Sequence, residues 1–433
     1  MKNNSKYLII GNSVAAVACV ESIRRTDAEG SITLVSDETY HTYSRPLISY
    51  LLGGKIGPER MFYRDNNFYT ENNVNAILGK KAVKIDADKK TVVLNDGSEL
   101  GYEKLMISTG GTPIVPDMPG VKSSGVFTFT TWDDTNNIKE YIEKNKVKKA
   151  VVIGGGLIGL KATEALLALD IKVTILELAD RILAATFDKK ASAIIGSELE
   201  KVGCAVITNN TVTKINAAKT GAKNIKEVVL KNKKKIPAEI LIVAIGVRPN
   251  IEFLKSSGIK TNRGIVVDDK MQSSLKDVYA AGDCCEAKEF LSGLPQVIAI
   301  WPSAARQGRI AGNNMAGGTE KYTGNLAKNS VELCGVPTIS VGLTDTTKEK
   351  ALEVIEVYEP ENLIYRKVVI RNNKIVGIVF VGNITRAGIY TGLIKDGVDI
   401  SSFRSHILKE DFGLISLPKE YRKHLVSGAG IEV

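Results

Sequence analysis

The clearest chemistry in the sequence is carried by a GxGxxG pattern of Gly154, Gly156 and Gly159. The pattern follows the apolar, β-branched run 150–153, which predicts a buried strand, and precedes a stretch that predicts a helix. The glycines allow a tight turn, close approach of a pyrophosphate to the backbone and close packing of helix on strand, and the helix N-terminus attracts phosphate. Glu177 follows at close to the roughly 20-residue spacing at which an acid binds a ribose 2′-hydroxyl. The pattern therefore predicts a dinucleotide site.

The carboxylate of Glu177 also indicates which dinucleotide is bound. The predicted helix spans 160–169, and the strand 172–176 ends at this acid. A carboxylate accepts hydrogen bonds from ribose hydroxyls and repels a 2′-phosphate. No basic residue follows Glu177 before Arg181, so the sequence favours NAD, with Arg181 as the residue that could favour NADP.

A less complete copy of the pattern lies near the N-terminus. Gly11, Ser13 and Ala16 take the three glycine positions after a strand predicted at 7–10. Alanine is tolerated at the third position, whereas serine at the second allows a less close phosphate approach. Two adjacent acids follow the next predicted strand slightly later than a ribose-binding acid usually comes. Two such patterns in one chain predict two dinucleotides.

The two copies are not a tandem repeat, because the second interrupts the first. Strand–turn signals stand at 105–113, 240–250 and 277–283, on both sides of the second pattern. The predicted fold class is α/β, with two Rossmann-like domains, one inserted in the other, and a C-terminal α+β domain. The expected domains are 1–118 and 248–322 for the first dinucleotide, 119–247 for the second, and 323–433 for the C-terminal domain.

Composition narrows the class of protein. The 433 residues are 44% hydrophobic with a net charge of +10, and they contain no apolar run of membrane-spanning length and no secretory signal pattern. The net charge suits either a lysine-rich solvated surface or an acidic protein partner. The sequence predicts a protein that binds no nucleic acid and no membrane. Its five cysteines lack disulfide-like and metal-like spacing, which predicts a cytoplasmic location and no metal site: Cys19, Cys204, Cys284, Cys285 and Cys334.

Taken together, these signals resemble the two-dinucleotide flavoprotein family, the pyridine nucleotide-disulfide oxidoreductase fold in its broad sense. The segments ISTGGTP (107–113) and YAAGDCCE (279–286) are similar to that family's motifs, and the likeness covers roughly 6–320. The resemblance implies that the first pattern binds FAD and the inserted one NAD(H). The implied FAD contacts are Gly11, Ser13, Ala15, Ala16, Asp37, Glu38, Arg45, Pro46, Val83, Thr109, Gly110, Gly282, Asp283 and Trp301. The implied NAD contacts are Gly154, Gly156, Leu157, Ile158, Gly159, Glu177 and Gly246.

Within this family the chemistry depends on the segment 40–50, which here reads YHTYSRPLISY and has no sulfur. Without a cysteine beside the flavin, electrons have no thiolate route to a disulfide or a peroxide. The YxRP pattern instead resembles rubredoxin and ferredoxin reductases and the N-terminal part of nitrite reductase large subunits, in which electrons pass through the flavin to an iron–sulfur protein. No covalent catalyst is expected, and the residues expected beside the flavin are Arg45, Pro46, Lys161 and Trp301, the last opening a helix whose N-terminus favours anionic flavin.

The C-terminal part predicts strands joined by short turns, followed by two helices. Its ending resembles the tails of FAD subunits found beside carbon monoxide dehydrogenase and phenylglyoxylate dehydrogenase, and the alternative is an ordinary dimer domain. The expected strands are 331–336, 339–343, 354–358, 365–370 and 375–380, with a hairpin turn at 372–373, and the expected helices are 386–395 and 402–409.

Some residues depart from the family pattern. Lys161 stands where the family usually has glutamate, and Thr130 where related ferredoxin reductases often have an FAD-binding arginine. The adjacent pair Cys284 and Cys285 is interpreted as structural. Two alternatives stay open: an NADH oxidase or coenzyme A-disulfide reductase-like enzyme that uses another cysteine, such as Cys334, and a non-catalytic, NADH-responsive assembly protein similar to apoptosis-inducing factor.

Overall fold

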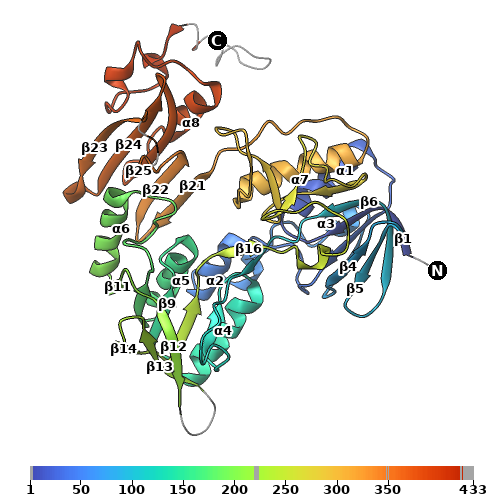
Figure 1. The fold of residues 1–433 in the computed structure, drawn as a ribbon, viewed down its shortest axis with the longest axis horizontal. Coiled ribbons are helices and arrows are strands. Elements are labelled where there is room, and N and C mark those ends of the chain that lie inside the picture. Colours follow the sequence, from blue (N-terminus) through green and yellow to red (C-terminus); the bar gives the residue numbers. More distant parts are fainter. Residues whose placement is uncertain (1–2, 219–223, 348, 350, 420–421, 423–433) are drawn as a thin grey trace.

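The computed structural model describes residues 3–218, 224–347, 349, 351–419 and 422. The chain forms three parts, each built on its own main β-sheet (Figure 1). The first sheet lies on the right, the second at the lower left, and the C-terminal sheet above the second. None of the helices in the described ranges is long and apolar enough to cross a membrane.

The first sheet is mostly parallel and is made by two separate stretches of chain. Its continuous order is β3 (Val74–Leu78), β2 (Ile32–Ser36), β1 (Asn3–Ile10), β6 (Glu99–Ile107), β5 (Thr91–Leu94) and β4 (Ala82–Asp86). β18 (Val278–Ala280) returns much later to pair in parallel with the C-terminal end of β6. The predicted interruption of the first nucleotide fold is therefore confirmed.

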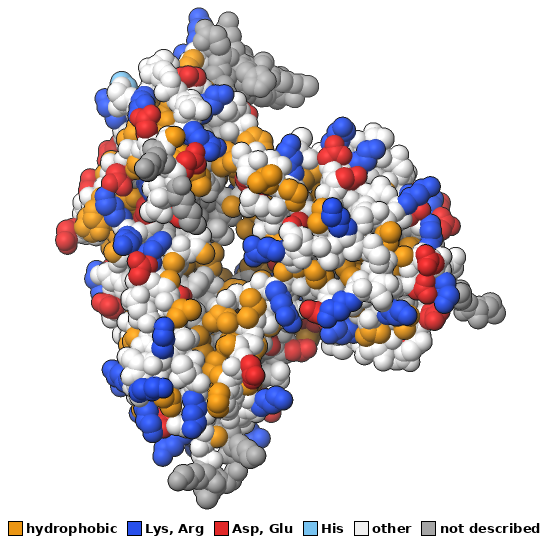
Figure 2. All heavy atoms as spheres, viewed as in Figure 1, with side chains coloured by type: hydrophobic (Ala, Val, Ile, Leu, Met, Phe, Trp, Pro, Cys, Tyr) orange, Lys and Arg blue, Asp and Glu red, His pale blue; other side chains and the backbone are white. Residues whose placement is uncertain are grey.

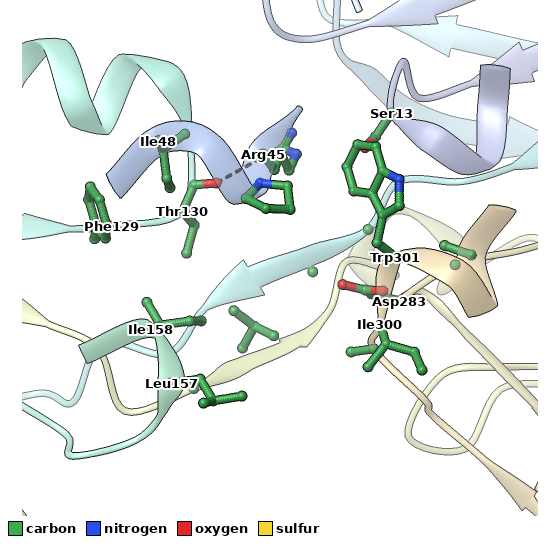
Figure 3. A pocket seen from close by; sticks show the side chains of 18 of the residues that line it. Ser13, Arg45, Ile48, Phe129, Thr130, Leu157, Ile158, Asp283, Ile300 and Trp301 are labelled. Carbon is green, nitrogen blue, oxygen red and sulfur yellow. Dashed lines mark hydrogen bonds between the residues drawn. The ribbon is translucent and has the colours of Figure 1, made fainter. Parts of the chain in front are cut away.

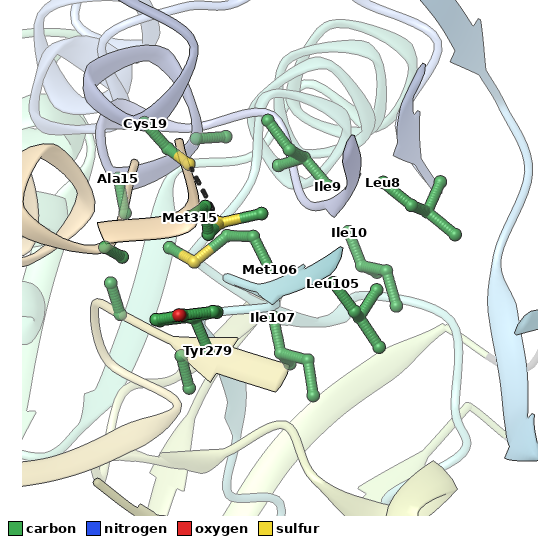
Figure 4. Close-up of a cluster of buried hydrophobic side chains, with 14 of the residues drawn as sticks. Leu8, Ile9, Ile10, Ala15, Cys19, Leu105, Met106, Ile107, Tyr279 and Met315 are labelled. Atoms are coloured by element: carbon green, nitrogen blue, oxygen red, sulfur yellow. Dashed lines mark hydrogen bonds between the residues drawn. The ribbon is translucent and has the colours of Figure 1, made fainter. Parts of the chain in front are cut away.

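Two helices pack on this sheet at very short range. α1 (Val14–Thr26) follows β1, and α7 (Trp301–Met315) begins at the predicted residue. A Cβ on Gly308 would lie 2.1 Å from the carbonyl oxygen of Ala15, so only glycine permits this approach. The thiol of Cys19 in α1 lies 3.8 Å from the sulfur of Met315 in α7, and both side chains pack against the buried strands (Figure 4).

The second sheet lies wholly within the inserted segment. Its order is β11 (Ala205–Ile207), β10 (Lys172–Leu176), β9 (Lys149–Ile153), β15 (Ile240–Val243) and β8 (Val126–Thr128), all parallel. A three-stranded antiparallel sheet of β12 (Val212–Ala217), β13 (Ile225–Leu230) and β14 (Lys235–Pro237) lies beside it. The helices are α4 (Trp132–Asn145), α5 (Leu157–Leu167) and α6 (Lys189–Lys201). α5 begins three residues earlier than predicted because Gly156 itself is the N-cap.

Two short strands pair where the chain passes between the first part and the second part. β7 (Gly111–Pro113) and β16 (Val247–Pro249) form an antiparallel pair, and the Thr109 hydroxyl donates to the carbonyl of Asn250 at 2.7 Å. The short helices α2 (Ile48–Leu52) and α3 (Phe68–Glu71) follow β2, and α2 packs against α4 and α5. The remaining short strands are β17 (Ile265–Val266), β19 (Cys285–Lys288) and β20 (Pro295–Gln296).

The C-terminal sheet is antiparallel, and its order is β21 (Lys328–Leu333), β22 (Val336–Gly342), β25 (Lys374–Val381), β24 (Ile364–Arg371) and β23 (Glu353–Glu359). The single strand predicted at 331–336 is wrong: Cys334 and Gly335 have φ of +51° and +77° and form a tight hairpin turn there. α8 (Ala387–Asp396) matches the first predicted helix, and the hairpin turn at 372–373 is confirmed.

The second C-terminal helix predicted, 402–409, is wrong. The segment forms only a 3-10 turn, Arg404–His406. Asp399 accepts hydrogen bonds from the N–H and the hydroxyl of Ser401, and such local bonds compete with a helix. Buried Phe403 and Ile407 hold the turns on the sheet, which accounts for the helix-like apolar spacing.

Candidate functional site

One large cavity lies where the three parts meet. Its volume is about 2170 Å³, and it is lined by the N-termini of α1, α5 and α7, the segment 43–50, and residues of β21, β22 and α8. The space-filling view shows the molecule hollowed at this junction (Figure 2). In close-up, side chains near the starts of α1, α5 and α7, among them Ser13, Leu157 and Trp301, lie around the same space (Figure 3).

The first glycine pattern opens onto this cavity. Gly11 has φ of +115°, and a Cβ there would lie 2.2 Å from the carbonyl oxygen of Ser108. Ser13 is the N-cap of α1, and its side chain forms no cap hydrogen bond. Gly11, Ser13 and Ala15 line the cavity, whereas Ala16 is fully buried in the core and does not. Of the FAD contacts implied by the resemblance, all but Ala16 line the cavity.

Asp283 has the environment of a ligand-binding acid. It follows β18 and faces the cavity near Trp301 (Figure 3). Its carboxylate accepts no hydrogen bond from any residue that the structure describes. Burial raises the pKa of Asp283, and the nearby charge of Arg45 opposes that rise. A partly buried carboxylate that faces the cavity and accepts no hydrogen bond from the described residues is free to accept hydrogen bonds from a ligand.

The charge of Arg45 acts on two acids. Its guanidinium pairs with Glu38 and donates to the carbonyl of Thr130 at 2.9 Å, and it is close enough to influence the pKa of Asp283. Tyr43 also donates to Glu38, at 2.8 Å. Burial raises the pKa of Glu38, although Arg45 and Tyr43 counteract this. The guanidinium is thus paired with the acid that follows β2, and its charge also acts on the acid that follows β18.

The second glycine pattern has the geometry that its spacing predicts. Gly154 has φ of +104°, and a Cβ on Gly159 would lie 1.9 Å from the carbonyl oxygen of Gly154. Gly159 therefore lets the helix pack on the strand and does not itself line the cavity. By contrast, there is nothing within 4 Å of a Cβ built on Gly156, which leaves open space before the N-terminus of α5. The other expected NAD contacts all line the cavity.

Glu177 is held by the backbone around that loop. Its carboxylate accepts from the N–H of Gly155 at 2.6 Å and from that of Ala179 at 2.8 Å. Arg181 is turned onto Asp180 at 2.8 Å and contacts the carbonyl of Phe187. Arg181 is therefore already paired and does not line the cavity, which favours NAD(H).

Lys161 lines the cavity, but its ammonium group is paired. The Nζ atom lies 2.5 Å from Glu164 Oε2, donates to the carbonyl of Glu332 at 3.2 Å, and lies 5.2 Å from the ring centroid of Tyr50. Lys161 therefore lines the cavity as expected, but Glu164, an acid one turn along the same helix, balances its charge.

None of the cysteines lines the cavity. Cys284 and Cys285 are fully buried, and burial raises the pKa of Cys284 to about 11. Cys334 lies in the β21–β22 turn, and burial raises its pKa to about 11 as well. Thiols of such high pKa are protonated at neutral pH and are poor nucleophiles.

The C-terminal wall of the cavity was missed by sequence reasoning. It includes Lys328 on β21 and Lys395 on α8, and neither forms an ion pair with an acid in the described ranges. Burial lowers the pKa of Lys328, and the nearby charge of Lys395 adds to this. No local pattern joins two lysines that lie so far apart in the sequence.

These residues fit two dinucleotides in one cavity. The loops at Gly11 and Gly154 place helix N-termini where diphosphates bind, and each has an acid at the end of the following strand. The unpaired carboxylate of Asp283 completes the first site. The apolar side chains of Leu157, Ile158 and Ile300 line the cavity between the two sites and can pack against the aromatic rings of bound dinucleotides (Figure 3).

Comparisons with known proteins agree with this geometry. Residues 5–308 match the family model for pyridine nucleotide-disulphide oxidoreductases, and 329–398 match that for the rubredoxin NAD+ reductase C-terminal domain. The chain is 35% identical over 409 residues to the NADH-dependent phenylglyoxylate dehydrogenase subunit epsilon of Aromatoleum evansii, covering 94% of this chain and 95% of that one.

Two further comparisons show the extent of the likeness. The chain is 31% identical to the nitrite reductase [NAD(P)H] of Bacillus subtilis over 92% of its own length, but it spans only 48% of that protein. Among solved structures, the NAD-dependent persulfide reductase from A. fulgidus is 28% identical with a TM-score of 0.83, covering 92% of this chain and 78% of that one.

Proposed function

Because the chain belongs to the pyridine nucleotide-disulphide oxidoreductase family, we propose that it is an FAD-dependent NAD(H) oxidoreductase that exchanges electrons with an iron–sulfur protein or subunit. The observation that carries this proposal is a single cavity with two dinucleotide loops and no cysteine in its lining. The match of residues 329–398 to a rubredoxin reductase domain supports an iron–sulfur partner.

The FAD site is assigned to the first glycine loop and its surroundings. The free N–H groups at the start of α1 bind a diphosphate, and Asp283 accepts hydrogen bonds from the ribityl hydroxyls. Arg45 was expected beside the flavin, but it pairs with Glu38 and its charge acts on Asp283, so we assign it instead to the diphosphate of FAD. Pro46 and Trp301 are assigned to the isoalloxazine surroundings. Bound FAD can take a hydride from NADH and release electrons one at a time.

The NAD(H) site is assigned to the second loop. The N-terminus of α5 attracts the diphosphate, and open space at Gly156 lets it approach the backbone. Glu177 orients the adenosine ribose, since its carboxylate is fixed by two N–H groups and retains lone pairs for ribose hydroxyls. Leu157 and Ile158 exclude water between the two sites and orient the nicotinamide.

The division of the chain follows the same assignment. We assign 1–118 and 248–322 to FAD, 119–247 to NAD(H), and 323–433 to a C-terminal domain that contacts the partner. The pairing of β18 with β6 and the confinement of the second sheet to 126–243 support these boundaries. The free thiols of all five cysteines support a reducing, cytoplasmic location.

A reductive titration tests the function. Dithionite should reduce the purified protein with two electrons per FAD and without a thiolate–flavin absorbance band. Uptake of further electrons with such a band would instead support the oxidase or coenzyme A-disulfide reductase alternative. The high pKa of Cys334 and its position outside the cavity argue against that alternative.

A further inference from the structure

Two side chains of α5 bind the hairpin formed by β21 and β22. Lys161 donates to the carbonyl of Glu332 at 3.2 Å and pairs with Glu164 at 2.5 Å. Glu164 in turn accepts the N–H of Cys334, at the tip of the hairpin, at 2.6 Å. The ion pair is largely shielded from solvent, because the two side chains are only 23% and 19% exposed.

The helix that makes these contacts is the helix whose first turn faces the NAD(H) site. Leu157 and Ile158 line the cavity, and so does Lys161 one turn later. Glu332 of the hairpin, whose carbonyl accepts the hydrogen bond from Lys161, also lines the cavity. The side chains therefore join the nucleotide-binding helix directly to the C-terminal wall.

The backbone conformation of the turn at the tip of the hairpin depends on the hydrogen bond to Glu164. Cys334 has φ of +51°, a left-handed conformation that is unfavourable for a residue with a side chain. Such two-residue hairpin turns ordinarily use asparagine or glycine at this position. The bond to Glu164 holds the backbone of Cys334 in that conformation.

We propose that Lys161 and Glu164 are positioning residues that couple occupation of the NAD(H) site to the placement of the β21–β22 hairpin. An anionic diphosphate at the N-terminus of α5 stabilises the helix, and the Lys161–Glu164 pair carries that effect to the hairpin. By linkage, a fixed hairpin also strengthens NAD(H) binding by the same factor. This goes beyond the assigned electron transfer, and it depends only on binding of NAD⁺ at α5.

Hydrogen exchange of the hairpin with and without NAD⁺ tests the coupling. In the wild-type protein, saturating NAD⁺ should slow exchange of the peptide covering 328–342 by about five-fold or more, with the Cys334 amide included. Lys161→Met should abolish this NAD⁺-dependent difference, and Lys161→Arg should retain it. The apolar contacts of Leu333 and Val336 remain in both variants and should keep the hairpin folded.

The chain offers a matched control on another helix. Lys201 and Glu198 form a pair of the same spacing on α6, at 2.7 Å, so Lys201→Met should leave the NAD⁺-dependent difference unchanged. Glu164→Gln provides a second variant, which keeps an acceptor for the Cys334 N–H but loses the charge, and it should reduce the difference partly. Equal NAD⁺-dependent protection in the wild type and Lys161→Met, or none in the wild type, would overturn the proposal. Because the readout needs no electron acceptor, failure of the proposed electron transfer to an iron–sulfur protein would not affect it.

Discussion

At the scale of single residues, Glu177 shows how an acid selects a cofactor. Its carboxylate is already held by the N–H groups of Gly155 and Ala179, so little ordering is required when a ribose binds. Arg181, the residue that could have favoured NADP, is paired with Asp180. Selectivity therefore depends on an oriented acid and on the pairing of Arg181 with Asp180.

Glu177→Ala should weaken NADH binding while FAD is retained. Loss of one charged hydrogen bond costs about 1.5–3 kcal/mol, which corresponds to a roughly 10- to 150-fold higher Kd. Stopped-flow reduction of the flavin at varied NADH concentration measures this. Glu200→Ala is the matched control, because that acid is exposed on α6 of the same part and away from the glycine loop. The added substitution Leu178→Arg should move preference toward NADPH. An unchanged NADH affinity in Glu177→Ala would contradict the assignment.

Asp283→Ala should yield mostly protein without FAD. The carboxylate faces the cavity and accepts no hydrogen bond from the described part of the chain, so the ribityl hydroxyls are its expected partners. The variant should also have a lower Tm, because a cofactor that binds only the folded state stabilises it by mass action. The FAD-to-protein absorbance ratio after purification measures the loss, and Asp283→Asn should retain an intermediate amount. A fully yellow Asp283→Ala protein would show that the motif was misread.

At the scale of elements, the sequence predicted the helices, strands and turns whose boundaries are set by residues close together in the chain. The strand–glycine–helix units at Gly11 and Gly154, the start of α7 at Trp301 and the hairpin at 372–373 were all predicted, because each has its own turn or cap residues. The β21–β22 turn was missed because cysteine occupies a left-handed position that usually has asparagine or glycine.

The candidate site was predictable only in part, for a related reason. Motif residues could be assigned to each dinucleotide because their spacing has a physical cause. The pairing of Arg45 with Glu38 and of Lys161 with Glu164 depends on side-chain directions that no periodicity specifies. The wall that contains Lys328 and Lys395 depends on how the C-terminal sheet is placed.

A second polar contact joins α6 to the C-terminal sheet. Asp188, the N-cap of α6, accepts from the hydroxyl of Tyr365 at 2.6 Å and from Lys367 Nζ at 2.9 Å. The Lys367 side chain is only 5% exposed. Although burial acts to raise it, the pKa of Asp188 is lowered overall by the hydrogen bonds from Tyr365 and Lys367.

This contact predicts a dependence of stability on pH. A depressed carboxyl pKa stabilises the folded state above the unfolded value of about 3.9, and that contribution is lost as pH falls through the lower folded pKa. Asp188→Asn should lower the free energy of unfolding at pH 7 by about 1.5–3 kcal/mol and flatten its decline below pH 4. Urea unfolding at several pH values measures both effects. An equally steep acid decline in the variant would contradict the prediction.

At the scale of the whole molecule, three parts contribute walls to one cavity. The parts that carry the two dinucleotide loops meet through β7 and β16, and the C-terminal sheet shares a hydrophobic cluster with the second part. The C-terminal wall presents Lys328 and Lys395 without acidic partners in the described ranges, although Glu332 lies on the same strand. An acidic partner would find complementary charge there.

Lys328→Glu with Lys395→Glu should therefore slow turnover with an acidic iron–sulfur protein. Charges at the rim of an interface act mainly on the association rate, so kcat/KM should fall about ten-fold at low salt and the difference should shrink as ionic strength rises. Reduction of the flavin by NADH should be unchanged. Lys233→Glu with Lys234→Glu is the control, since both are exposed in a turn of the second part. Equal kcat/KM values in the wild type and the cavity variant would exclude this docking surface.

The central claim is that electrons pass between NADH and an iron–sulfur protein through FAD, with no redox-active cysteine. The most direct measurement is anaerobic turnover of the FAD-loaded protein with NADH and a one-electron acceptor such as rubredoxin. The account predicts about two acceptor molecules reduced for each NADH oxidised, at the same rate in a variant with all five cysteines changed to serine or alanine. NADH oxidation that requires oxygen or a disulfide, or that is lost when Cys334 alone is changed, would contradict it.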